Sequence, residues 1–215
     1  MKLKNKQLII FDLDGTLIDS GPDLAASLNY TLDKLRKKNY TQQKIHNWVG
    51  NGAKTLVKRA LLGKTDVDKE DVDAVLLKSA LEIFLAHYSK NVCVKTHTYK
   101  NVIQTLENLK KSNYKMAIVT NKPYNFIEPI LKKLQILEFF DLFIGGDSLL
   151  EKKPSPKPLV HVCKTLEVEI KSSVMVGDSK NDILSANACE MQSIGVTYGY
   201  NYGEDISKYN PSAVI

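Results

Sequence analysis

The stretch Leu8–Thr16, LIIFDLDGT, decides the fold of this chain. Its first four residues form a short apolar run that Gly15 closes, which predicts a buried strand leading into a turn. Because side chains alternate along a strand, Asp12 and Asp14 are expected to lean to the same side. Two carboxylates directly after a buried strand favour a sheet whose ligands bind at the carboxyl ends of its strands.

Further strand-like runs recur along the chain, and after residue 98 they alternate with helical patterns. The strands are expected at Leu8–Phe11, Lys115–Thr120, Leu142–Gly145, Ser173–Gly177 and Ser193–Val196, and the helices at Lys100–Lys111, Phe126–Leu134, Pro158–Leu166 and Asn181–Ala188. This alternation is typical of a parallel sheet covered by helices on both faces. We therefore predict an α/β fold with a doubly wound, Rossmann-like core.

The segment between Thr16 and Thr98 shows no comparable strand. Amphipathic patterns instead predict helices at Asp23–Lys37, Thr41–Trp48, Ala53–Leu62 and Asp68–Tyr88. We expect residues 1–16 and 98–215 to form the α/β core, and residues 17–97 to form an all-helical domain inserted after the first strand.

The composition is that of an ordinary soluble protein of 215 residues, with 43% hydrophobic and 25% charged residues. The net charge of +6 comes from lysines scattered without interleaved aromatic residues, so no nucleic-acid partner is expected. The apolar run before Asp12 is too short for a secretory signal or a membrane span. Three cysteines, an odd number, indicate a reducing compartment. We expect a cytoplasmic protein with no membrane partner, either a monomer or a homodimer.

Four short stretches, far apart in the chain, together predict one phosphate-handling site. They are FDLDGT at 11–16, VTNK at 119–122, KKPSPKP at 152–158 and VGDSKND at 176–182. Taken alone, each has a purely structural explanation: a turn, a strand end, a rigid loop and a helix cap. Their occurrence together, three after predicted strands and one before a predicted helix, favours phosphate chemistry.

Asp12 is the candidate nucleophile, because an ionised aspartate can attack phosphorus and divide a hydrolysis into two steps. Its carboxylate and the phosphate repel each other, which predicts a Mg²⁺ ion bound to both. Asp178 is the expected second ligand, and Asp182 is expected to orient Asp178 or a metal-bound water. Asp14 is then free to transfer protons to the leaving oxygen and from the attacking water.

Two further stretches are expected to supply partners for the phosphoryl oxygens. Thr120 and Asn121 follow the apolar strand residues Met116–Val119 and can donate hydrogen bonds to these oxygens. Lys153 supplies a positive charge to the phosphoryl group and to Asp12.

The four stretches resemble the motifs of the haloacid dehalogenase-like hydrolases. The resemblance implies an aspartyl-phosphate mechanism, with Mg²⁺ held by Asp12, by the backbone carbonyl of Asp14 and by Asp178. It also implies that the inserted helical domain is a mobile cap. The motif lysine is Lys153, which directly precedes a proline as in the family, rather than Lys152.

Two more stretches resemble one branch of this family, the phosphoglycolate phosphatases: WVGNGA at 48–53 and VTYGYNYGE at 196–204. In the first, Gly50, Asn51 and Gly52 are expected to present backbone N–H groups to a small carboxylate, with a simple helix-connecting turn as the alternative. The second has a surface loop as its alternative. The resemblance implies a phosphoric monoester hydrolase that converts 2-phosphoglycolate to glycolate and phosphate.

Two other functions stay open at this point. The same chemistry can act on another small phosphate, such as pyrophosphate, a sugar phosphate or a nucleotide. The chain can also be a catalytically silent, phosphate-binding regulatory domain. The presence of both Asp12 and Asp14 argues against the silent domain, because a protein that only binds phosphate can lose the second carboxylate.

Overall fold

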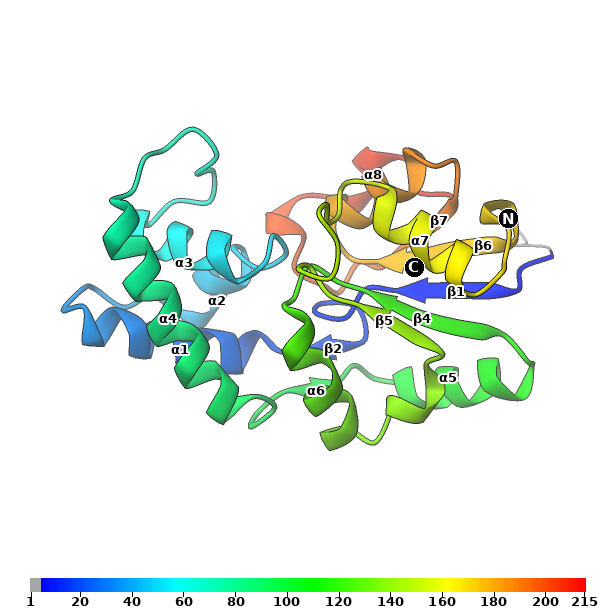
Figure 1. The fold of residues 1–215 in the computed structure, drawn as a ribbon, viewed down its shortest axis with the longest axis horizontal. Helices are drawn as coiled ribbons and strands as arrows, with labels where there is room; N and C mark the ends of the chain where they lie inside the picture. Colours follow the sequence, from blue (N-terminus) through cyan, green and yellow to red (C-terminus); the bar gives the residue numbers. More distant parts are fainter. Residues whose placement is uncertain (1–4) are drawn as a thin grey trace.

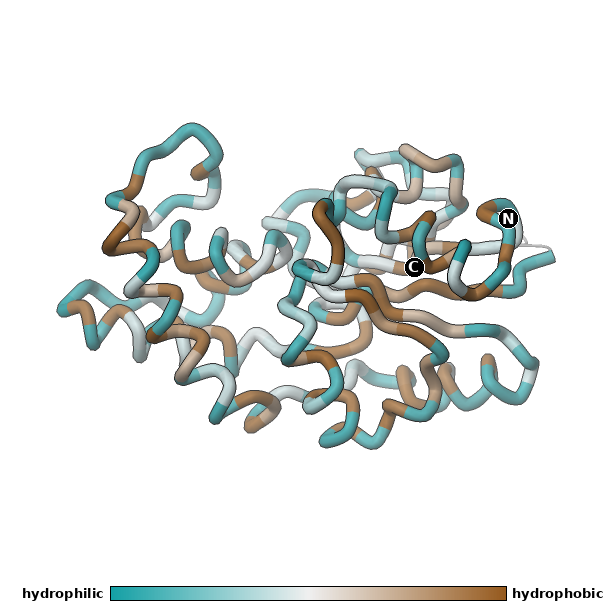
Figure 2. The backbone as a smooth tube through the Cα atoms, viewed as in Figure 1, coloured by the Kyte–Doolittle hydropathy of each residue, from teal (hydrophilic) through white to brown (hydrophobic). Residues whose placement is uncertain are grey.

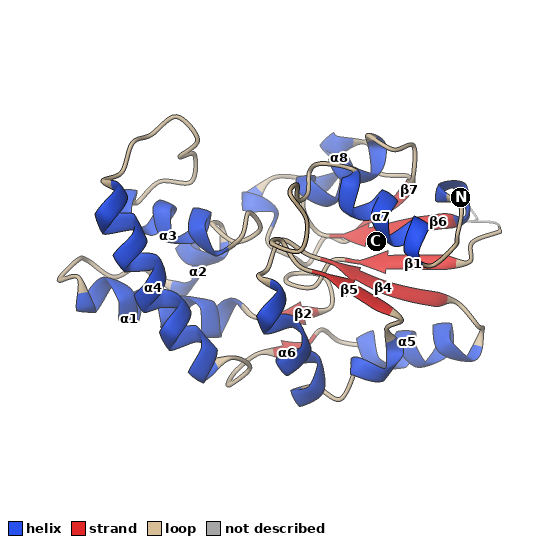
Figure 3. Ribbon diagram, in the orientation of Figure 1, coloured by secondary structure: helices blue, strands red, loops and turns tan. Residues whose placement is uncertain are grey.

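The computed structural model describes residues 5–215 and shows the α/β architecture that the sequence predicts (Figures 1 and 3). The main strands are β1 (Leu8–Phe11), β4 (Lys115–Val119), β5 (Leu142–Ile144), β6 (Ser173–Gly177), β7 (Gln192–Gly195) and β8 (Ala213–Val214). They form one sheet in the order β5-β4-β1-β6-β7-β8, with every neighbouring pair parallel.

The central strand β1 fixes where the site lies. Its apolar residues are fully buried, and Figure 2 shows the hydrophobic strands running together through the middle of the core. Phe11 lies opposite Ile118 of β4 and Val176 of β6, so these three strands end nearly level. The chain order reverses around β1, and ligands bind at such a switch point in open α/β sheets.

Helices cover both faces of the sheet. In Figure 1, α5 (Val102–Lys111) and α6 (Ile127–Lys133) lie on one face, and α7 (Lys157–Thr165) and α8 (Lys180–Asn187) on the other. Alternate β1 residues divide between the two cores, because Ile9 packs with the α5–α6 side and Ile10 with the α7–α8 side. Short 3₁₀ turns lie at Tyr124–Phe126, Leu137–Phe139, Ile170–Ser172, Asn201–Gly203 and Ile206–Tyr209.

The inserted segment forms a helical cap beside the carboxyl edge of the sheet (Figure 1). Its helices are α1 (Gly21–Lys34), α2 (Gln42–His46), α3 (Ala53–Leu62) and α4 (Ala74–Asn91). The large side chains of Trp48, Phe84 and Tyr88 are buried within it. In the part of the chain that the structure describes, no helix combines the length and hydrophobicity needed to cross a membrane.

Two sequence predictions for this segment are wrong in detail. The fourth helix begins at Ala74 rather than Asp68, because the Asp73 carboxylate accepts a hydrogen bond from the Leu76 N–H at 2.7 Å and caps the helix there. Two short strands were also missed: β2 (Ile18–Asp19) and β3 (His97–Thr98) pair antiparallel. At two residues each, they are too short to give a readable alternation.

The two connections between cap and core are tied together by Asp23 of α1. Its buried carboxylate accepts hydrogen bonds from the backbone N–H groups of Val94, Lys95 and Thr96 at 2.8–3.0 Å. It also accepts one from the Thr96 hydroxyl at 2.7 Å. The segment that returns to the core is therefore held against the start of the first cap helix.

Candidate active site

The residues predicted from the four motifs meet at the carboxyl ends of β1, β4 and β6. Asp12 and Asp14 follow β1, Thr120 follows β4, and Asp178 follows β6. Lys153 comes from the loop before α7. All are buried except Asp14, which is half-buried. The sheet therefore gathers side chains that are more than 160 positions apart in the chain.

The Asp12 carboxylate is poorly neutralised. Lys153 Nζ forms an ion pair with Asp12 Oδ1 at 2.9 Å, but the same ammonium is shared with Asp182. Burial raises the pKa of Asp12 to about 8, with Lys153 opposing the shift and Asp182 and Asp178 adding to it. An additional cation beside Asp12 would favour its ionised form.

Asp178 is held by hydrogen bonds from two directions. Its Oδ1 accepts from the Thr16 hydroxyl and its Oδ2 from the Tyr200 backbone N–H, both at 2.8 Å. Gly15 allows this approach: its φ is +88°, and a Cβ there would lie 2.3 Å from Asp178 Oδ2. Burial, followed by repulsion from Asp182, raises the pKa of Asp178 to about 7.

These carboxylates fit a divalent metal ion. Oxygens of Asp12, Asp178 and Asp182 lie within 4.8 Å of one another. Among the described residues these three buried carboxylates share one cation, Lys153, and hard cations such as Mg²⁺ prefer carboxylate ligands. Asp182 accepts three hydrogen bonds, whereas Asp178 accepts one on each oxygen, and this favours Asp12 and Asp178 as the metal ligands.

Asp182 makes contacts that were not predicted. Its Oδ2 accepts hydrogen bonds from the backbone N–H and the hydroxyl of Ser179, at 3.0 and 2.8 Å, and so forms a capping box at the start of α8. Its Oδ1 lies 2.5 Å from Lys153 Nζ. Asp182 therefore positions Lys153, while Thr16 and Tyr200 position Asp178.

Asp14 has a partner that the sequence reasoning missed. Lys122 Nζ lies 2.8 Å from Asp14 Oδ1 and 2.9 Å from Oδ2, and the Ser20 hydroxyl donates to Oδ1 at 2.5 Å. Burial opposes the charge on Lys122, but Asp14 and Tyr88 outweigh it and raise the pKa of Lys122. The sequence did indicate a polar role for Lys122, because it directly follows two polar residues at a strand end in VTNK.

Asn121 lines the cavity beside Asp12 and makes contacts that were not predicted. Its Nδ2 donates to the backbone carbonyls of Gly50 and Lys153, both at 3.0 Å. Asn121 thus links the cap loop to the loop that carries Lys153.

The loop Gly50–Gly52 is bound to the core through its carbonyl groups and one side chain. The Gly50 carbonyl also accepts from Asn181 Nδ2 at 3.2 Å, and the Asn51 carbonyl accepts from Lys152 Nζ at 2.7 Å. Asn51 Oδ1 accepts from the Tyr202 hydroxyl at 2.7 Å. The second branch-like stretch, 196–204, is therefore more than a surface loop: it contacts the cap through Tyr202 and Asp178 through Tyr200.

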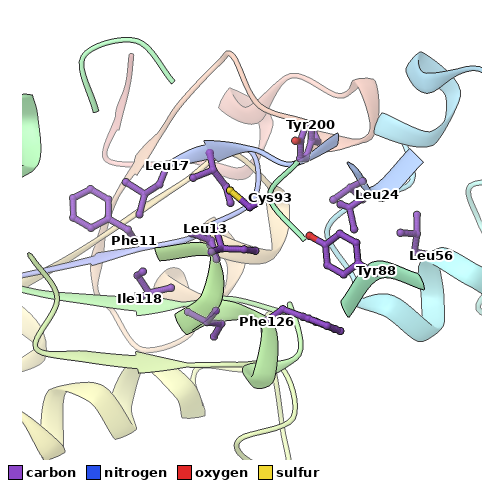
Figure 4. Packing of buried hydrophobic residues seen from close by; sticks show 14 of the residues in the cluster. Phe11, Leu13, Leu17, Leu24, Leu56, Tyr88, Cys93, Ile118, Phe126 and Tyr200 are labelled. Carbon is purple, nitrogen blue, oxygen red and sulfur yellow. The ribbon is translucent and has the colours of Figure 1, made fainter. Parts of the chain in front are cut away.

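A cavity of about 40 Å³ lies between cap and core, room for a few water molecules. Core residues on its wall include Asp12, Asp14, Thr120 and Lys122, and the cap contributes Gly50, Gly52 and apolar side chains. Figure 4 shows several of these side chains, including Leu24, Leu56, Tyr88 and Phe126. The space suits a small ligand that is polar at one end.

Comparison with known proteins agrees with this geometry. The family model of haloacid dehalogenase-like hydrolases matches residues 9–196. A phosphoglycolate phosphatase of Colwellia psychrerythraea is 53% identical over 211 residues, which cover 98% of this chain and 93% of that protein. One of Psychrobacter arcticus is 47% identical over 208 residues, covering 97% and 90%. A structure described as a predicted phosphoglycolate phosphatase from Haemophilus somnus superposes with a TM-score of 0.92 at 37% identity, covering 99% of this chain and 95% of the other.

Proposed function

The chain belongs to the haloacid dehalogenase-like hydrolase family, as its motifs predict, and we propose that it hydrolyses 2-phosphoglycolate to glycolate and phosphate. The observation that carries this proposal is the small cavity that joins Asp12 and Asp14 to the cap. Its polar end fits a phosphoryl group, and the cap residues Leu56, Phe84 and Tyr88 wall off its other side, which favours a small ester over a sugar phosphate or a nucleotide. The names of the similar proteins support the same substrate.

Asp12 is the nucleophile in this proposal. Its carboxylate attacks phosphorus and forms an aspartyl phosphate, which water then hydrolyses. Asp14 gives a proton to the departing glycolate oxygen and then takes one from the attacking water. Both carboxylates line the cavity, as these roles require.

The remaining polar groups bind the phosphoryl oxygens. Lys153 supplies positive charge beside Asp12, and its position is fixed by Asp182. Thr120, at the end of β4, lines the same cavity and offers its hydroxyl to a phosphoryl oxygen. The bonds of Asn121 to the two loops give it the role of holding the cap loop in place.

Asp12 and Asp178 would hold Mg²⁺, together with the backbone carbonyl of Asp14. The ion would neutralise the carboxylate and the phosphate as they approach each other. Residues 17–97 act as the cap domain in this proposal, with Gly50, Asn51 and Gly52 closing over the substrate and excluding water.

A panel of phosphorylated metabolites tests the substrate assignment. We expect kcat/KM with Mg²⁺ to be highest for 2-phosphoglycolate, measured as phosphate release beside pyrophosphate, sugar phosphates and nucleotides. A higher kcat/KM for any of these other compounds would contradict the proposed substrate but not the aspartyl-phosphate mechanism.

Two carboxyl variants test the chemistry itself. Asp12→Asn should abolish turnover, because an amide is a poor nucleophile. Asp14→Asn should lower kcat by about 10²–10⁴-fold, the usual effect of removing a general acid or base. Near-normal activity of either variant on an alkyl phosphate would contradict the assigned roles, and so would the absence of all phosphatase activity in the wild type.

A further inference from the structure

Lys122 lines the cavity between cap and core with a buried ammonium group. Its side chain is 3% exposed, and it is the only cationic residue among the described residues that line the cavity. Lys153, the other buried lysine of the site, is held by Asp12 and Asp182 instead. Lys122 pairs with Asp14, which accepts from its ammonium through both oxygens.

Tyr88, near the end of α4, lines the same cavity. The residue is 1% exposed, and its Oη completes no hydrogen bond among the described residues, although the neighbouring Lys122 opposes the rise in its pKa. Leaving such a group unpaired costs about 1–3 kcal/mol, and a phenylalanine would fill the same space without that cost. Packing alone therefore does not explain the hydroxyl.

The Tyr88 ring is held so that its hydroxyl has a fixed direction. The ring stacks on Phe84 with centroids 5.7 Å apart and meets the edge of Phe126 at 5.0 Å. In Figure 4 the Tyr88 oxygen points toward the side on which Leu13 lies, between Asp12 and Asp14 in the chain. Lys122 Nζ lies 5.0 Å from the centroid of the same ring. Burial raises the pKa of Tyr88 to about 12, so the hydroxyl keeps its proton and can donate at neutral pH.

The rest of the wall on the cap side is mainly apolar. Leu24, Val49, Leu56 and Phe84 line it, with Phe126 from the core. Such walls exclude water and strengthen the attraction between a bound anion and a nearby cation. An anionic group that enters beyond the phosphoryl position therefore finds two donors, Lys122 and Tyr88.

We propose that Lys122 and Tyr88 bind the carboxylate of the substrate. When the substrate binds, Lys122 breaks its ion pair with Asp14 and pairs with the substrate carboxylate instead. This inference rests on the proposed function, since it assigns the carboxylate end of that substrate to these two residues. The exchange removes one partner from Asp14 and leaves its oxygens to Ser20 and to the leaving group. Lys122 and Tyr88 select for a leaving group that carries a carboxylate, whereas the phosphoryl-binding residues recognise only the phosphate ester.

A comparison of two small esters tests this selection. Ethyl phosphate has a leaving group of similar length to glycolate but lacks the carboxylate. We expect Tyr88→Phe to lower kcat/KM for 2-phosphoglycolate roughly tenfold or more, the size of one hydrogen bond to a charged group. The same change should leave the value for ethyl phosphate within about twofold. Tyr124→Phe is the matched control, because Tyr124 is 46% exposed and is not among the cavity residues, and it should change neither value.

Lys122→Met gives a second measurement on the same pair of esters. It should lower the preference for 2-phosphoglycolate over ethyl phosphate by a larger factor than Tyr88→Phe. If the wild type prefers 2-phosphoglycolate and Tyr88→Phe keeps that preference unchanged, the carboxylate does not bind here and the inference is wrong. If the wild type itself shows no preference for 2-phosphoglycolate, the proposed substrate fails, and the inference fails with it.

Discussion

Lys153 Nζ lies 2.5 Å from Asp182 Oδ1 in a fully buried ion pair, and Asp182 in turn caps the helix that follows Asp178. The lysine that faces Asp12, the proposed nucleophile, is thereby positioned by the start of α8. The loop that carries Lys153 and the loop that carries Asp178 are joined by this contact, so the charge beside Asp12 depends on both.

Lys153→Ala should lower kcat/KM by about 10²-fold or more, because it removes a preorganised charge from the reacting group. It should also lower the melting temperature, since Asp182 and Asp12 would be left buried without their cation. Lys157→Ala is the control: Lys157 is exposed and pairs only with Glu151, so both quantities should stay near the wild type. Equal effects of the two variants would contradict the assignment of Lys153.

The stability of the metal-free protein should fall as pH rises from about 4 to about 8. Folding raises the pKa of Asp12 to about 8 and of Asp178 to about 7, so the folded state keeps protons that the unfolded state releases in this range. Mg²⁺ bound to the two carboxylates should remove most of the fall. The fall in stability is measured as the melting temperature at each pH in this range, once in EDTA and once in Mg²⁺. Asp178→Asn should make the melting temperature in EDTA depend less on pH. A curve in EDTA that is level, or that Mg²⁺ leaves unchanged, would argue against this metal site.

Gly52→Ala should hinder closure of the cap. A Cβ at Gly52 would lie 2.9 Å from the Asn121 carbonyl oxygen, which cannot move aside without disturbing the end of β4. We expect kcat/KM for 2-phosphoglycolate to drop by roughly tenfold, with a smaller loss on an aromatic test phosphate that needs no carboxylate contact. Gly203→Ala matches it in backbone strain, since both residues have a positive φ, but a Cβ at Gly203 meets nothing within 4 Å. If the two variants lose activity equally, strain alone explains the effect.

Asp23→Ala should destabilise the junction between cap and core. It leaves the N–H groups of Val94, Lys95 and Thr96 without their shared acceptor, at a cost of about 2–4 kcal/mol in the free energy of unfolding. Thr96→Val removes only the hydroxyl contact and should cost about 1 kcal/mol. Urea denaturation distinguishes the two. Similar values for both variants would show that the backbone contacts contribute little.

Much of the core could be predicted because its signals are local. The strand Leu8–Phe11 has the predicted bounds, since its apolar run ends at a turn of aspartate and glycine. The same holds for Ser173–Gly177 and for the helix Ala53–Leu62, which ends at a left-handed Gly63. The gathering of the motif residues followed from parallel strands ending at one edge.

Pairings across the fold could not be predicted in the same way. The bond between Asp14 and Lys122 joins residues 108 positions apart, and nothing in the local sequence says which carboxylate a lysine will meet. The pairing of Asp182 with Lys153 was not predicted, because two carboxylates in one motif suggest a shared partner, whereas the start of α8 turns Asp182 toward Lys153. The contacts of Tyr202 with the cap loop depend on how the cap is seated on the core.

The short antiparallel pair β2–β3 makes the cap an exchangeable module. The chain leaves the core and returns to it side by side, with Asp19 paired directly to His97. A two-residue turn between these positions would close the pair as a hairpin and leave the order of the six-stranded sheet untouched. Insertions of other sizes can be grafted at the same place, so substrate choice can diverge while the hydrolytic machinery is inherited unchanged.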